Sequence, residues 1–107
     1  MTIAEWLDSR TPPAPPRLHA RLHAALRPWA QVDATAACEH CLTAAEDILR
    51  HLLADESRGR ARALDLLAAD ALVTYAFEAA SDEPDTLARC TEVAMLRIAR
   101  LGAGAIA

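Results

Sequence analysis

Two histidines and two cysteines in the first half of the chain have the residue types and spacing of a metal site. His19 and His23 are four residues apart, so one face of a helix can present both imidazoles. Cys38 and Cys41 follow in the next predicted helix, and a short turn can bring the two pairs together. Imidazole and thiolate are usual zinc ligands, so these four residues form a candidate zinc site. In the simpler interpretation, the histidines are solvated boundary residues and the cysteines are small core residues.

Cys38 and Cys41 also have the C-x-x-C spacing of redox motifs. Such a motif needs a preceding strand and a helix N-terminus that lowers the thiol pKa. The sequence predicts no strand here, and Glu39 lies between the two cysteines. We therefore expect ordinary reduced thiols, and the odd total of three cysteines also argues against a disulfide framework.

A line of polar side chains runs along the most apolar predicted helix. Asp70, Thr74 and Glu78 follow one another at intervals of four residues, and Tyr75 lies beside them. The simpler interpretation is an exposed seam, or an ion pair with arginines of a neighbouring helix. The alternative is a ligand-binding pocket that the two carboxylates face. No paired nucleophile and base and no Gly-rich phosphate loop accompany this line, so it does not indicate an enzyme.

The segment 67–78, LAADALVTYAFE, resembles one helix of the isoprenyl diphosphate synthases, the helix that follows their first aspartate-rich motif. The family pattern is usually L-A-G-D-A-L-L-T-x-A-F-E, and Ala69 stands here in place of its glycine. The resemblance implies an all-α fold and a helix that lines an apolar cavity. That family uses magnesium held by two aspartate-rich motifs, whereas this chain contains no D-D-x-x-D sequence. The positions that carry over are Asp70, Leu72, Thr74, Ala76, Phe77 and Glu78.

The helices that must position these residues follow from the spacing of apolar side chains. The segment 62–80 is apolar around most of its circumference, which predicts a central helix covered from several sides. Further helices are predicted at 16–27, at 33–54 with Asp33 as N-cap, and from about 84 to Gly102 as C-cap. The inward stripes of the last three long helices include Cys38, Cys41, Ala45, Ile48, Leu52 and Leu53; Leu64, Leu66, Leu67, Ala68 and Leu72; and Leu87, Cys90, Ala94, Ile98 and Leu101.

A short helix and a proline-rich strap precede this bundle. Thr2 and Glu5 have the spacing of a capping box, which predicts a helix ending near Ser9. The prolines of 11–16 favour an extended segment, and we expect this strap to lay Trp6 on the bundle. The predicted organisation is therefore a short helix and strap at 1–16 and a helical bundle at 17–107.

Composition limits the fold and the partners. The chain has 107 residues, enough for one domain, and is 53% hydrophobic, with the excess in Ala and Leu, which favour helices. We therefore predict an all-α, four-helix bundle-like single domain. The net charge of −4 argues against a nucleic-acid partner. No apolar run is long enough to cross a membrane, and Glu5 and Asp8 interrupt any signal peptide, so we expect a cytoplasmic protein.

These observations favour a small non-catalytic protein that acts through protein contacts, as a homodimer. Val93 and Leu96 lie on the otherwise polar side of the last helix and are the candidate interface residues. We expect no cofactor. One alternative is a binder of an apolar or isoprenoid-like molecule beside Asp70, Thr74, Tyr75 and Glu78. The other is zinc binding through His19, His23, Cys38 and Cys41.

Overall fold

The chain is all-α, as predicted, in the computed structural model, which describes residues 1–55, 59–81 and 84–106 without the side chains of 104–106. In the described part of the chain, short 3₁₀ turns at Arg27–Trp29 and Ala34–Ala36 link the second helix to the third. The helices are α1 (Ile3–Asp8), α2 (Pro16–Leu26), α3 (Ala37–Ala54), α4 (Arg60–Ala80) and α5 (Pro84–Ile106).

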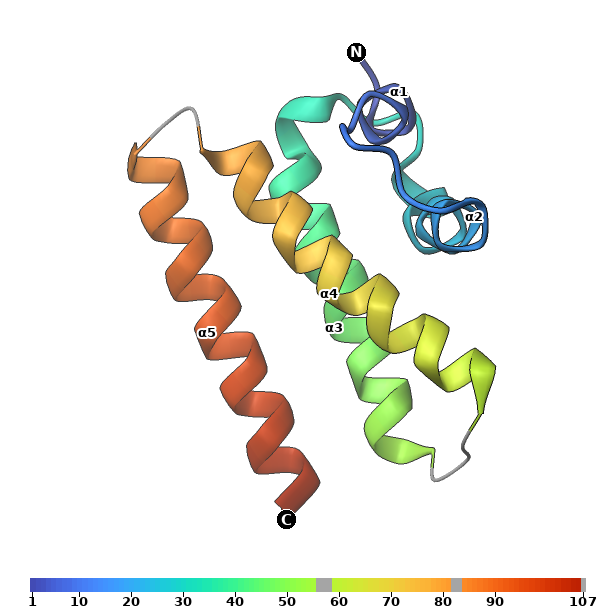
Figure 1. Ribbon diagram of the computed structural model, residues 1–107. Coiled ribbons are helices and arrows are strands. Elements are labelled where there is room, and N and C mark those ends of the chain that lie inside the picture. The colour runs from blue at the N-terminus through green and yellow to red at the C-terminus, as the bar shows by residue number, and fades with distance from the viewer. Residues whose placement is uncertain (56–58, 82–83, 107) are drawn as a thin grey trace.

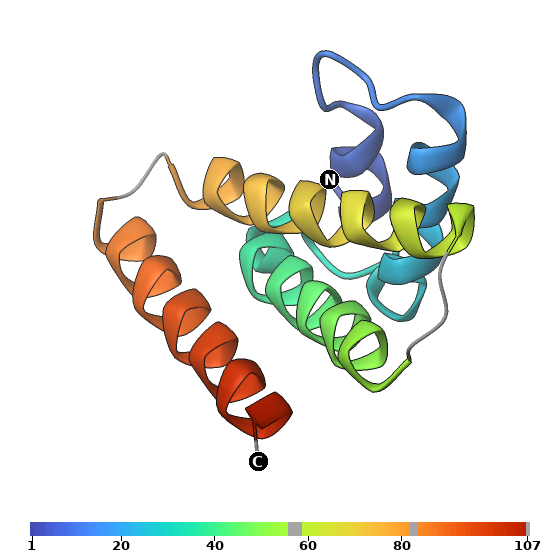
Figure 2. The ribbon, with the colours of Figure 1, turned by 60° about the horizontal axis from the view of Figure 1, so that its bottom comes forward.

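Helix α4 is the central element of the fold. It runs antiparallel to α3 and packs most extensively against it, while α2 and α5 contact α4 from opposite sides (Figures 1 and 2). The most buried positions of α4 are Ala68, Ala69, Leu72, Ala76 and Ala80. Four of these five are alanines, whose small side chains allow the helix axes to approach closely. The prediction of a central helix with neighbours on several sides is confirmed.

Helix α1 is fixed to the bundle by both its backbone and its side chains. The Thr2 hydroxyl accepts a hydrogen bond from the Glu5 amide, the predicted N-cap. The amide of Ile3 donates to the carbonyl of Val32 at 2.8 Å, which ties the start of the chain to the segment before α3. Trp6 is only 7% exposed and meets the ring of Tyr75 edge-on, with ring centroids 6.2 Å apart. Trp6 thus packs on the bundle, as expected.

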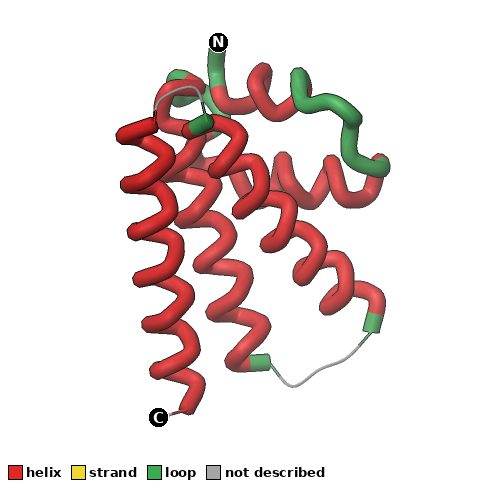
Figure 3. The backbone as a smooth tube through the Cα atoms, turned by 60° about the vertical axis from the view of Figure 1, so that its left-hand side comes forward, coloured by secondary structure: helices red, strands yellow, loops and turns green. Residues whose placement is uncertain are grey.

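Helix α5 lies at the edge of the fold, where Figure 3 shows it beside α3 and α4. It continues through Gly102 to Ile106, so the predicted C-cap at Gly102 was wrong. Nothing lies within 4 Å of a side chain built at Gly102, so only the helix propensity of glycine opposes the helix there, at a cost of about 1 kcal/mol.

Four residues assigned to inward stripes are instead exposed. The spacing of apolar residues identifies an apolar face, but it does not show whether a neighbour covers that face along its whole length. The exposed residues are Leu53, Leu66, Leu67 and Ile98.

Candidate metal centre

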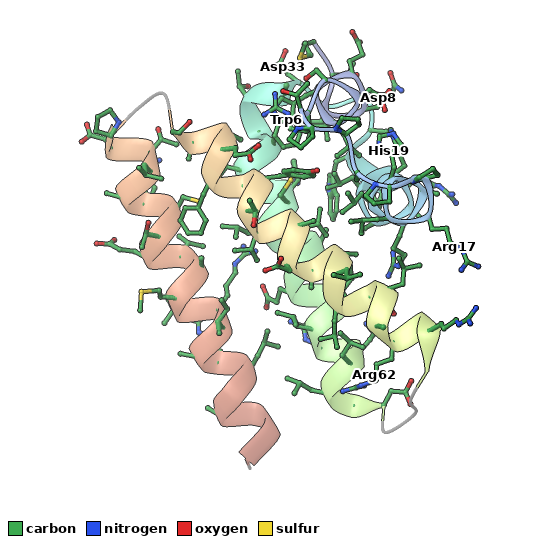
Figure 4. The ribbon with its side chains drawn as sticks, viewed as in Figure 1. Trp6, Asp8, Arg17, His19, Asp33 and Arg62 are labelled. Carbon is green, nitrogen blue, oxygen red and sulfur yellow. The ribbon has the colours of Figure 1, made fainter. Side chains whose placement is uncertain are left out.

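The candidate site lies where α1 and α2 form a helical hairpin. Asp8 is the last residue of α1, and the proline-rich strap then reverses the chain. Pro16 is the first residue of α2, a position where its missing amide costs nothing. His19 and His23 lie one turn apart on α2 and point towards α1. Figure 4 shows Asp8 of α1 next to His19 of α2.

Three ligand atoms converge in this hairpin. Oδ1 of Asp8 lies 2.9 Å from Nε2 of His19 and 2.7 Å from Nε2 of His23. The two Nε2 atoms are 3.1 Å from each other, and the imidazole planes are inclined at 77°. The three atoms therefore form a small triangle with a nitrogen, a nitrogen and a carboxylate oxygen at its corners.

The charges of this cluster favour a cation. Hydrogen bonds from His23, which has the larger effect, and from His19 hold the pKa of the Asp8 carboxyl below its ordinary value. Asp8 is therefore ionised at neutral pH and provides a negative ligand. The two imidazoles provide neutral nitrogen ligands once they have lost their Nε2 protons.

The triangle has dimensions that suit a first-row transition metal ion. Zinc binds histidine nitrogen and carboxylate oxygen at about 2.0–2.1 Å in a tetrahedral arrangement, which places ligand atoms about 3.4 Å apart. The distances of 2.7, 2.9 and 3.1 Å need to increase by about 0.3 to 0.7 Å to reach that value. The side chains of His19 and His23 are 34% and 35% exposed, so an ion can enter and retain water as a further ligand.

The predicted cysteine ligands do not join the histidines. Cys41 is fully buried in the core, and Cys38 places its sulfur 2.7 Å from that of Cys90 on α5. Burial raises the pKa of the Cys41 thiol to about 12, and burial together with the contact with Cys90 raises that of Cys38 to about 12. The four-residue zinc site was therefore wrong in its cysteines, because Cys41 lies in the core and Cys38 lies against Cys90 of α5.

Asp8 is a candidate ligand that the sequence did not predict. It replaces the cysteines as the third member of the cluster. Within residues 1–55, 59–81 and 84–106, no other three His, Cys, Asp or Glu side chains bring their ligand atoms together in this way. The only signal in the sequence was an acidic residue at the end of a short helix that a proline strap folds back onto the His19 and His23 helix.

The polar line on α4 faces solvent. Asp70 and Thr74 are exposed, and the Thr74 hydroxyl donates to the carbonyl of Asp70 within the helix. Glu78 lies 3.4 Å from the guanidinium of Arg10, which also stacks over the ring of Trp6. Tyr75 is half-buried against Trp6. These residues match the simpler of the two interpretations, a seam with one ion pair to a neighbouring segment.

A hollow of about 330 Å³ lies elsewhere, between the start of α3 and α5. Its lining includes Cys38, Leu42, Cys90 and Val93, with Arg89 and Arg97 at its polar edge. It is separate from the predicted ligand residues of α4.

Comparisons with known proteins give no family for this chain. No protein-family model matches it, and neither the curated proteins nor the solved structures contain a match. Among the described residues, no helix is both long and apolar enough to cross a membrane.

Proposed function

We propose that the protein binds a divalent transition metal ion of the zinc class through Asp8, His19 and His23. The observation that carries this proposal is the convergence of three ligand atoms, no two of them more than 3.1 Å apart, from two different helices. Two imidazole nitrogens and one carboxylate oxygen are a ligand set that zinc and its neighbours in the first row prefer to magnesium or calcium. Zinc is the ion to test first because it needs no redox partner.

Metal binding would fasten the N-terminal hairpin. Asp8 is the last residue of α1, and His19 and His23 lie on α2, so one ion would join the two helices on either side of the strap. Trp6 lies two residues before Asp8 and is buried against α4. An ion that binds only to the folded hairpin stabilises the hairpin by mass action. It thereby also stabilises the packing of Trp6 against α4. The proposed role is therefore that of a metal-stabilised helical protein, with an open coordination position that water or a ligand can fill.

The test is a titration of chelator-treated protein with zinc, in which calorimetry measures the affinity and the number of ions bound. The expected result is one zinc per chain and a strong loss of affinity in His19→Gln and His23→Gln. His51→Gln is the matched control, because His51 is also an exposed helical histidine one turn from an acidic residue, Asp47, and its Nδ1 contacts the Asp47 carbonyl. Equal zinc binding by the His23→Gln and His51→Gln variants would contradict the proposal.

Function through protein contacts, the role that the sequence favoured, is a second candidate. The outer side of α5 is the observation that favours it, and the next subsection develops that surface. Binding of an apolar or isoprenoid-like molecule beside Asp70 has less support, because the side chains of Asp70 and Thr74 face solvent.

A further inference from the structure

Helix α5 is packed on one side only. Cys90 and Ala94 are buried against α3 and α4, and Arg97 reaches across to α3, where it lies 3.4 Å from Glu46 and donates to the Thr43 hydroxyl. Figures 1 and 3 show the opposite side of the helix facing away from the rest of the fold. The helix is therefore firmly anchored on its inner side and bare on its outer side.

The bare side of α5 carries an apolar strip that is interrupted by the exposed Glu92. Met95 and Leu96 are 68% and 52% exposed. They are surrounded along the helix by exposed residues with small side chains: Ala88, Ala99, Gly102 and Ala103. Small residues on both sides of large ones allow a second helix to approach closely while Met95 and Leu96 fill the space between the two axes. Val93, the other residue predicted to lie on this side, is half-buried against the core, so that expectation was wrong.

Two opposite charges lie at equal distances from Leu96. Glu92 precedes it by four residues and Arg100 follows it by four, and both side chains are exposed. Among the described residues neither makes an ion pair. In an antiparallel pair of helices that cross at Leu96, Glu92 of each copy lies opposite Arg100 of the other.

We propose that the outer side of α5 pairs with α5 of a second copy, antiparallel and centred on Leu96. The twofold symmetry makes every favourable contact occur twice. The apolar strip of each copy covers that of the other, and two Glu92–Arg100 pairs form between the copies. The strip from Ala88 to Ala103 extends over about 24 Å, at the usual rise of the α-helix. One helix from each copy buries less than the roughly 1,200 Å² at the low end of stable interfaces, so we expect a weak, reversible dimer with a dissociation constant on the order of micromolar or weaker.

The proposal is tested by sedimentation equilibrium in the presence of a chelator, which removes any contribution from metal bridging. The wild-type chain is expected to show a monomer–dimer equilibrium, and Leu96→Glu is expected to be monomeric at every concentration. Leu53→Glu is the matched control, because Leu53 is equally exposed, at 54%, but lies on α3. Helical content by circular dichroism checks that each variant folds.

Charge reversal tests the antiparallel register. Glu92→Arg or Arg100→Glu alone places like charges opposite each other twice, and is expected to weaken the dimer by about tenfold. The double variant exchanges the two charges and is expected to restore wild-type affinity. A monomer at all concentrations, an equal effect of Leu53→Glu and Leu96→Glu, or no recovery in the double variant would each overturn the proposal. None of these results depends on zinc, so they leave the metal proposal to its own test.

Discussion

Nε2 of His23 lies 2.7 Å from Oδ1 of Asp8, although 15 residues separate them in the chain. This contact exists only because the strap folds α1 back along α2. His19 completes the cluster from the same face of α2, at 2.9 Å from the same oxygen. The three side chains therefore come together only when α1 and α2 form the hairpin.

Zinc should raise the thermal stability of the wild-type chain. At a free zinc concentration one hundred times the dissociation constant, ligand binding adds about 2.7 kcal/mol to the free energy of unfolding. For a domain of this size that corresponds to a rise in Tm of about ten degrees. Differential scanning calorimetry with and without zinc measures it, and Asp8→Asn, His19→Gln and His23→Gln should show little or no rise. An unchanged rise in these variants would place the ion elsewhere.

The pH dependence of zinc binding should follow the imidazoles and not the carboxylate. The lowered pKa of Asp8 keeps that carboxylate ionised as the solution becomes mildly acidic. Protons on the ligand nitrogens compete with zinc, so zinc affinity should be lower in mildly acidic solution than at neutral pH. Zinc titrations of the wild-type chain at about pH 7 and about pH 5 measure the decrease, and equal affinities at the two pH values would contradict imidazole coordination.

Trp6→Ala should be among the most destabilising single substitutions in the chain. Trp6 is 7% exposed, meets Tyr75 edge-on and lies beneath the Arg10 guanidinium at 4.7 Å. Removal of a buried indole costs about 3–5 kcal/mol of the free energy of unfolding. Urea denaturation measures the loss. Trp29→Ala is the comparison, because Trp29 is half-buried and stacks on His40, and it should cost clearly less.

The buried thiol of Cys41 should make the fold sensitive to alkaline pH. Its pKa is raised from 9.0 to about 12 by burial, so between these values the unfolded chain loses the proton that the folded chain retains. Stability should therefore decrease as the pH rises through this range. Urea denaturation at about pH 8 and about pH 10 measures the decrease, which should be smaller for Cys41→Ala than for the wild type. Equal decreases in both would contradict the assignment.

The helices of this chain could be predicted because local signals specify them. Asp33 caps the turn before α3, and Thr2 caps α1, as their positions in the sequence indicate. Alanine and leucine favour helix wherever they lie, so the class followed from composition. The end of α5 could not be predicted from Gly102, because an exposed glycine weakens a helix without having to end it.

Side-chain exposure and the third member of the candidate metal cluster could not be predicted in the same way. The apolar residues of α4 surround much of the helix, and the sequence does not show that Leu66 and Leu67 lie beyond the reach of its neighbours. The pairing of His19 with His23 could be predicted because the two residues lie one turn apart on the same helix. Asp8 joins them through the path of the strap, which depends on the packing of the whole hairpin against α4.

The most direct test of the metal site is the nuclear magnetic resonance of the imidazole nitrogens during a zinc titration. The chain has four histidines, so each ring can be assigned and followed separately. Coordination should shift the Nε2 resonances of His19 and His23 together and saturate at one zinc per chain, while those of His40 and His51 stay in place. Shifts at His40 or His51 of the same size, or none at His19 and His23, would show that Asp8 and its two histidines do not form a metal site.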